Sequence, residues 1–140
     1  MDRTTFLEIG GKIYPMRFSL AALREINNKY GSLEKMVDAV AGQEQDGMDM
    51  IQPIIWMLDL LIRQGCAYKN LFEKDVPVPE NASVVNGKWE PISVEAIEIG
   101  IGIDQIGDVK DKIFSCIVNG QKKTIETEPK EKNEKNTMTT

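Results

Sequence analysis

The sequence predicts a mainly helical α+β fold in which an N-terminal β-hairpin precedes a bundle of about five helices and a disordered C-terminal tail. Three observations lead to this prediction. β-Favouring residues flank a Gly-Gly pair near the N-terminus, apolar residues recur at helical spacing up to residue 120, and residues 121–140 contain almost no large apolar side chain. A chain of 140 residues is a usual length for one domain, so we expect a single domain over residues 1–120 and a tail over residues 121–140.

Residues 6–9 and 12–18 are the predicted strands of the hairpin. Gly10-Gly11 supplies the positive φ angles that a two-residue hairpin turn requires. Pro15 has no amide hydrogen to donate to a neighbouring strand, which predicts an edge position or a bulge in the second strand.

Two short amphipathic helices are predicted next. Ser19 is a suitable N-cap for the first and Gly31 a suitable stop, and its apolar stripe consists of Leu20, Leu23, Ile26 and Tyr30. Ser32 caps the second helix, which ends at Ala41-Gly42 and carries the stripe Leu33, Met36, Val37 and Val40.

A longer helix is predicted from about Met50 to Lys69, capped by Asp46 or Asp49 and with Pro53 in its first turn. One face carries Ile51, Ile54, Ile55, Leu58, Leu61, Ile62 and Cys66. The other side carries Trp56, Met57 and Leu60, beside Arg63 and Gln64. A helix with two apolar faces is either central to a core or shared with a partner, so these last five residues are the candidate protein-interaction site.

The remaining segments alternate between loop and helix. A long loop is expected around Asp75–Pro91, with a small hairpin at Asn86-Gly87, and it is either a functional loop or a tolerated insertion. Ser93 caps a short helix with the apolar residues Val94, Ile97 and Ile101, which Gly100 and Gly102 interrupt. Asp104 starts the last helix, Gly120 ends it, and its apolar face consists of Ile106, Val109, Ile113, Cys116 and Ile117.

The composition argues against several classes of function. The chain has no histidine, which removes the usual base of Ser/His/Asp and Cys/His nucleophilic systems. A net charge of -5 without an arginine-rich run argues against nucleic-acid binding. Cys66 and Cys116 lie far apart and are predicted to be buried thiols in a reducing compartment, not zinc ligands. We therefore expect no metal site and no cofactor.

Two further patterns resemble active-site motifs only superficially. Glu95 and Glu98 have the spacing of a carboxylate pair, but any solvated helix face shows it too. The run "GIGIDQIG" (residues 100–107) lacks the preceding strand of a phosphate-binding loop and is interpreted as a helix break. Because these catalytic patterns are absent, we expect that the protein is not an enzyme. The N-terminus lacks the apolar stretch of a signal peptide and no apolar segment is long enough to span a bilayer, so we expect a cytoplasmic protein.

The stretch "LEIGGKIYPMRFSLAALREINNKYGSLEKM", from Leu7 to Met36, resembles the opening of tail assembly chaperones from long-tailed phages of Gram-positive hosts. In that family a hairpin leads into Phe-Ser/Thr, an apolar helix and Lys-Tyr-Gly, which here are Phe18-Ser19, residues 20–26 and Lys29-Tyr30-Gly31. The later stretches "IIWMLDLLIRQGCAY" and "PISVEAIEIGI" resemble the family's second apolar helix and the short capped helix that follows it. The resemblance extends over about residues 7–120.

The resemblance implies a non-enzymatic chaperone that binds and solubilises the apolar, helical tape measure protein during tail assembly. It also implies a homo-oligomer that works in the host bacterial cytoplasm and is absent from mature virions. In such a protein the hairpin would brace the first helices or pair with a neighbouring subunit, although Pro15 disfavours edge pairing. The alternative is a structural tail or tail-tube component, or a small adaptor retained in the virion, in which the hairpin and the Asp75–Pro91 loop would pack in a ring.

Overall fold

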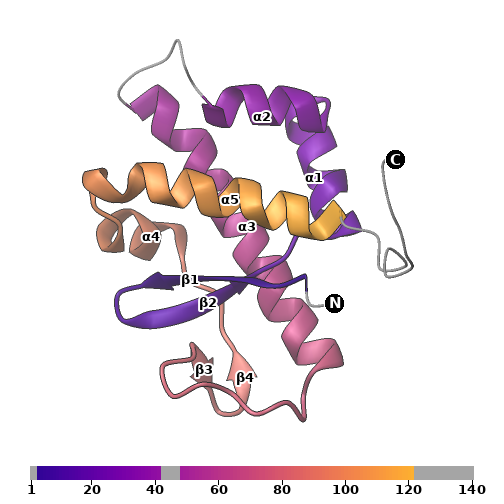
Figure 1. Cartoon of the computed structure of the whole chain (residues 1–140), viewed down its shortest axis with the longest axis vertical. Helices are drawn as coiled ribbons and strands as arrows, with labels where there is room; N and C mark the ends of the chain where they lie inside the picture. Colours follow the sequence, from indigo (N-terminus) through magenta and orange to yellow (C-terminus); the bar gives the residue numbers. More distant parts are fainter. Residues whose placement is uncertain (1–2, 42–47, 122–140) are drawn as a thin grey trace, which may run out of the picture.

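The long helix α3, Met48–Phe72, is the axis of the computed structural model, and the other elements pack around it (Figure 1). The structure describes residues 3–41 and 48–121. Within these ranges the order is β1 (Thr5–Ile9), β2 (Lys12–Met16), α1 (Leu20–Tyr30), α2 (Leu33–Ala41), α3, β3 (Val84–Val85), β4 (Lys88–Trp89), α4 (Val94–Gly100), the short 3-10 helix η1 (Ile103–Gln105) and α5 (Ile106–Gln121). The predicted mainly helical α+β fold with an N-terminal hairpin is confirmed. The predicted tail lies, from residue 122 onward, outside the described residues.

The N-terminal hairpin has the predicted two-residue turn. β1 and β2 are antiparallel, with Ile9 opposite Lys12, and both turn glycines have positive φ angles. The outer edge of β2 is hydrogen-bonded to residues 81–83. The Ile13 amide donates to the Asn81 carbonyl at 3.0 Å, and the Ser83 amide donates to the Ile13 carbonyl at 3.2 Å. Pro15 follows Ile13 by two residues, so its nitrogen also faces away from β1, and the ladder between the strands loses no hydrogen bond.

The hairpin braces the central helix and the last helix. α3 passes β2 at Gly65, where a Cβ atom would lie only 2.1 Å from the Pro15 carbonyl oxygen. Just beyond β2, the Arg17 amide donates to the Leu61 carbonyl at 3.1 Å. α5 lies on the other side of the hairpin, against β1 (Figure 1). The expectation that the hairpin braces the first helices is therefore corrected, because its main contacts are with α3 and α5.

Helix α1 begins and ends where the sequence predicts, but its predicted apolar stripe is not buried at Leu20. The Ser19 hydroxyl accepts a hydrogen bond from the Ala22 amide at 3.0 Å, and Gly31 ends the helix with a φ of 92°. Ala22 and Ile26 are fully buried, whereas Leu20, predicted to belong to the apolar stripe, is 86% exposed. The Ser19 hydroxyl also donates to Gln64 Oε1, which ties the start of α1 to α3.

Helix α2 confirms its prediction. The Ser32 hydroxyl accepts a hydrogen bond from the Lys35 amide at 3.1 Å, which caps the helix as expected. Met36 and Val40 are fully buried, and Leu33 and Val37 are partly buried against the core.

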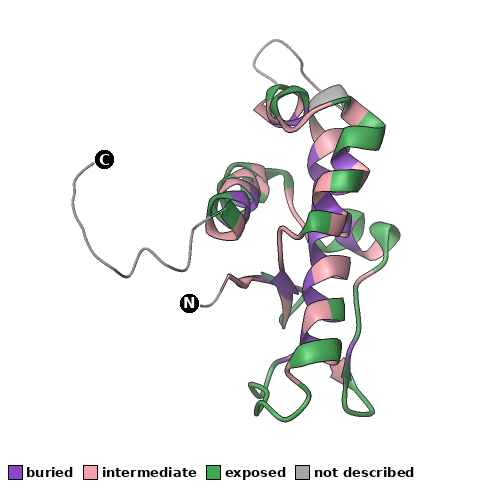
Figure 2. Ribbon diagram, turned by 90° about the vertical axis from the view of Figure 1, so that its right-hand side faces the viewer, coloured by how far each residue is buried: buried purple, intermediate pink, exposed green. Residues whose placement is uncertain are grey.

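Helix α3 is longer than predicted and is wrapped by its own chain. It begins at Met48, so Asp49 is its second residue and not its cap, and Asp46 lies outside the described residues. Pro53 consequently lies in the second turn instead of the first, where it removes one intrahelical hydrogen bond. The helix continues through it because the residues that follow, beginning with Ile54, are buried in the core. Figure 2 shows α3 extending along the molecule, with its buried residues toward the hairpin and α5.

The C-terminal elements follow the predicted order with two shifts. The small hairpin is present, with positive φ angles at Asn86 and Gly87, and Ser93 caps α4 by accepting from the Ala96 amide at 3.1 Å. The last α-helix starts at Ile106 and not at Asp104, because residues 103–105 form the 3-10 helix first. Gly120, predicted as a stop, lies inside α5, where a Cβ atom would be 2.7 Å from Phe18. It is a glycine because α5 and Phe18 approach closely there.

Candidate functional site

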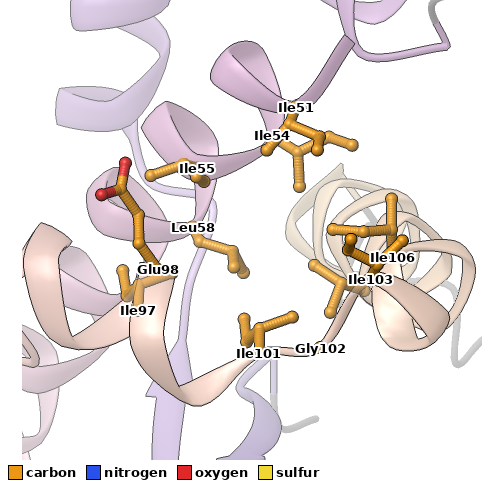
Figure 3. Close-up of a pocket in the computed structure, with 11 residues that line it drawn as sticks. Ile51, Ile54, Ile55, Leu58, Ile97, Glu98, Ile101, Gly102, Ile103 and Ile106 are labelled. Atoms are coloured by element: carbon orange, nitrogen blue, oxygen red, sulfur yellow. The ribbon is translucent and has the colours of Figure 1, made fainter. Parts of the chain in front are cut away.

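An apolar pocket opens between α3, α4, η1 and the start of α5 (Figure 3). Its cavity volume is about 260 Å³. Eleven residues line it: Ile51, Ile54, Ile55, Leu58, Ile97, Glu98, Ile101, Gly102, Ile103, Ile106 and Val109. Nine of these are aliphatic, so the pocket suits apolar side chains and offers almost no hydrogen-bonding partner to a polar ligand.

The floor of the pocket is the N-terminal half of α3. Ile54 and Leu58 are fully buried, and Figure 3 shows both side chains directed into the space between the helices. On the two sides, Ile97 of α4 and Val109 of α5 are almost completely buried and anchor their helices to the core. The floor and the anchors therefore belong to the folding core of the domain.

The break between α4 and α5 keeps the pocket open. α4 ends at Gly100, which lies so close to the hairpin that a Cβ atom there would be 2.8 Å from Ile9 Cγ2. Gly102 then has an extended backbone, and its amide donates to Gln105 Oε1 at 2.7 Å, which fixes the turn into η1. The chain crosses from α4 to α5 over this turn and does not cover the isoleucines on either side of it.

The rim of the pocket exposes aliphatic surface. Ile103 lines the pocket and is 86% exposed. Ile101 and Ile106 are partly buried against the core. An exposed aliphatic side chain is common when isolated, but here it continues an apolar pocket, which is the pattern of a protein-binding surface.

One carboxylate lines the pocket and a second lies next to a lining residue. Glu98 is the one charged residue among those that line the pocket in the described part of the chain. The Asp104 carboxylate lies beside Gly102, with Oδ1 only 2.6 Å from the position of a Cβ there. Neither carboxylate belongs to an ion pair between described residues. The pocket is thus aliphatic inside and acidic at its edge.

The residues that the sequence singled out for protein interaction lie elsewhere on α3. Met57 and Leu60 are completely buried and have no surface to offer a partner in this structure. Trp56 is half-buried against Tyr30, with the two rings edge to face at 5.5 Å, and Lys29 Nζ is 5.5 Å from the Trp56 ring centre. The second apolar face of α3 is therefore covered by α1 and α2, as the alternative of a helix central to the core expects.

Arg63 and Gln64 hold α1 against α3. Arg63 Nε is 3.0 Å from Asp59 Oδ2, and its Nη2 is 3.6 Å from Glu25 Oε1 on α1. Gln64 accepts the hydrogen bond from the Ser19 hydroxyl. The five predicted residues thus form the seam between α1 and α3, and the structure brings none of them to the pocket.

Sequence reasoning missed the rim of the pocket. It assigned Ile97, Ile101 and Ile106 to ordinary core faces and treated residues 100–107 only as a helix break. The available signal was the density of isoleucines around two glycines, at Ile99, Ile101 and Ile103, whose spacing of two residues does not place all three on one face of a helix.

The two cysteines are structural. Both are buried and free, as predicted, and burial raises the pKa of each thiol to about 12. Near Cys116 the Thr5 side chain, Arg17 and the Phe18 backbone oppose this shift, but desolvation dominates. Neither thiol is a nucleophile at neutral pH.

Within residues 3–41 and 48–121, no group of three or more Cys, Asp or Glu side chains is placed to hold a metal ion, and no helix is both long and apolar enough to cross a membrane. Comparisons of the chain with protein-family models, with curated proteins and with solved structures find no match.

Proposed function

We propose that this chain is a tail assembly chaperone of a long-tailed phage or prophage, and that the pocket between α3, α4 and α5 binds an apolar helical segment of the tape measure protein. The observation that carries the proposal is the open aliphatic pocket with Ile103 exposed at its rim. The family resemblance of the hairpin and first helices, over Leu7 to Met36, supports the same function.

The chemistry of the pocket fits such a client. A long apolar helix aggregates unless another protein covers its apolar side chains during assembly. The pocket offers aliphatic contact and few polar groups, so it favours burial of aliphatic side chains without requiring one particular sequence. The net charge of -5 keeps a complex with such a client soluble. A homo-oligomer in the bacterial cytoplasm, absent from mature virions, is part of this proposal.

Co-expression of the chain with fragments of a tape measure protein, followed by affinity capture, tests the proposal. Ile103→Asp places a charge where the client would bury an aliphatic side chain, so we expect roughly tenfold less client to be recovered. Leu20→Asp is the matched control, because Leu20 is also 86% exposed but lies on α1, away from the pocket. Equal recovery with both variants would contradict the role of the pocket.

Mass spectrometry of purified virions tests the second part of the proposal. A chaperone is released when the tail tube forms around the tape measure protein, so the chain should be absent from mature particles. Its presence there in stoichiometric amounts would favour a structural tail component instead.

A further inference from the structure

We propose that the segment recognised by this pocket is an amphipathic helix whose aliphatic side chains are flanked by lysine or arginine, and that Glu98 and Asp104 select it by charge. This inference rests on the proposed function and specifies the chemistry of its partner. It derives from the size of the pocket, from the charges at its edge and from the charge of the chain.

The size of the pocket limits what enters it. An engineered protein cavity of about 150 Å³ holds one benzene molecule. A cavity of about 260 Å³ therefore accommodates roughly two aliphatic side chains, and not a whole helix. Side chains three or four residues apart on a helix lie side by side, so one amphipathic helix laid across the rim can supply both.

The charges at the edge select the flanks of that helix. Glu98 on α4 and Asp104 on η1 stand on opposite sides of Ile101 in the sequence, and Figure 3 shows the Glu98 carboxylate at the edge of the pocket beside Ile97 and Ile55. No lysine or arginine of the described residues lines the pocket. A helix carrying basic residues beside its aliphatic ones would pair with these carboxylates, whereas acidic flanks would be repelled.

The same charges disfavour a second copy of this chain as the occupant. A two-fold symmetric contact through the pocket would bring the acidic rims of both copies into one interface. Both copies also carry a net charge of -5, which adds to the repulsion. The complementary partner is therefore a different polypeptide with basic flanks.

The test uses the full-length chain and two labelled synthetic helices with the same aliphatic positions, one flanked by lysines and one by glutamates. Fluorescence anisotropy should show that the lysine-flanked peptide binds roughly tenfold more tightly in low salt, and that the difference narrows at high salt. The double variant Glu98→Gln, Asp104→Asn should weaken binding of the lysine-flanked peptide by roughly fivefold. The control Asp111→Asn should not, because Asp111 is exposed on α5 outside the pocket.

The outcomes separate this inference from the proposed function. Equal binding of both peptides, lost in both cases with Ile103→Asp, would overturn the charge selection and leave the chaperone function standing. Failure of both peptides to bind, together with failure to capture tape measure fragments, would overturn both. A dimer of the free chain that Ile103→Asp dissociates would identify a second copy as the occupant and would also overturn the inference.

Discussion

Gly65→Ala tests whether the close approach of α3 to β2 is required by the fold. The added methyl carbon would lie 2.1 Å from the Pro15 carbonyl oxygen and 2.4 Å from the Pro15 carbonyl carbon. Since a carbon atom approaches a carbonyl oxygen to no less than about 3.3 Å, the helix would have to move away by roughly 1.2 Å. Both obstructing atoms belong to the backbone, so a change of side-chain rotamer cannot relieve the contact.

The expected loss of stability follows from this displacement. Overpacking of this kind costs about 1–3 kcal/mol. The movement would also break the hydrogen bond from the Arg17 amide to the Leu61 carbonyl, now 3.1 Å long, at a cost of about 1 kcal/mol. The better helix propensity of alanine returns about 1 kcal/mol. We therefore expect the free energy of unfolding to fall by about 2 kcal/mol.

Gly107→Ala is the control for this measurement. Gly107 lies in α5, and a Cβ atom there would meet nothing within 4 Å. The same substitution should therefore raise the free energy of unfolding by up to about 1 kcal/mol, through helix propensity alone. Urea denaturation followed by far-ultraviolet circular dichroism measures both variants. If Gly65→Ala were as stable as the parent protein, or more stable, the described contact between α3 and β2 would be wrong.

Three further predictions address the core and the buried polar groups. Leu60 is fully buried, so Leu60→Ser should lower the free energy of unfolding by about 3–5 kcal/mol and leave the oligomeric state, measured by size-exclusion chromatography, unchanged. Weaker self-association at unchanged stability would instead assign Leu60 to an interface. Asn70→Ala should lower the free energy of unfolding by about 2 kcal/mol, because the Asn70 side chain donates to the Trp89 carbonyl at 3.0 Å and accepts from the Trp89 amide at 2.9 Å. An unchanged midpoint of urea denaturation would show that these bonds are absent in solution. Because burial raises the pKa of Cys66 and Cys116 to about 12, the folded state keeps protons that the unfolded state loses above its ordinary thiol pKa of about 8.5. The contribution of the two thiols to stability should therefore be constant below that pH and be lost between about pH 9 and 12, and a double Cys→Ala variant with an equally steep alkaline decline would contradict this cause.

Local signals predicted most of the helices and strands. Ser19 and Ser93 cap their helices because a short hydroxyl side chain can satisfy a free amide without help from the rest of the fold. The Gly-Gly and Asn-Gly turns form because the positive φ angles they need are intrinsic to those residue types. Such features depend on a few neighbouring residues, so a single sequence contains all the information required to predict them.

The faces of the helices were harder to predict, because they depend on partners distant in the sequence. The predicted stripe of α1 begins at Leu20, yet the packing of the helix buries Ala22 and Ile26 and leaves Leu20 exposed. Gly120 has the sequence context of a helix stop, but its role is to let α5 approach Phe18. The sequence does not specify which segment will cover a given face, so neither outcome could be derived from periodicity.

The candidate site also depends on which segments cover a helix face, and periodicity alone does not predict this. Periodicity correctly found that α3 is apolar on two sides, and it left open which side is covered by the domain itself. In the structure α1 and α2 cover Met57 and Leu60, whereas on the opposite side a pocket opens between the buried residues Ile54 and Leu58 and the segment that joins α4 to α5. Leaving Ile103 exposed forgoes the roughly 1.5–3 kcal/mol that burial of an aliphatic side chain provides, which the fold recovers only if another molecule covers the rim. That deficit, located at one end of α3 and bordered by two carboxylates, is the physical reason to look for the partner at the pocket and not along the seam between α1 and α3.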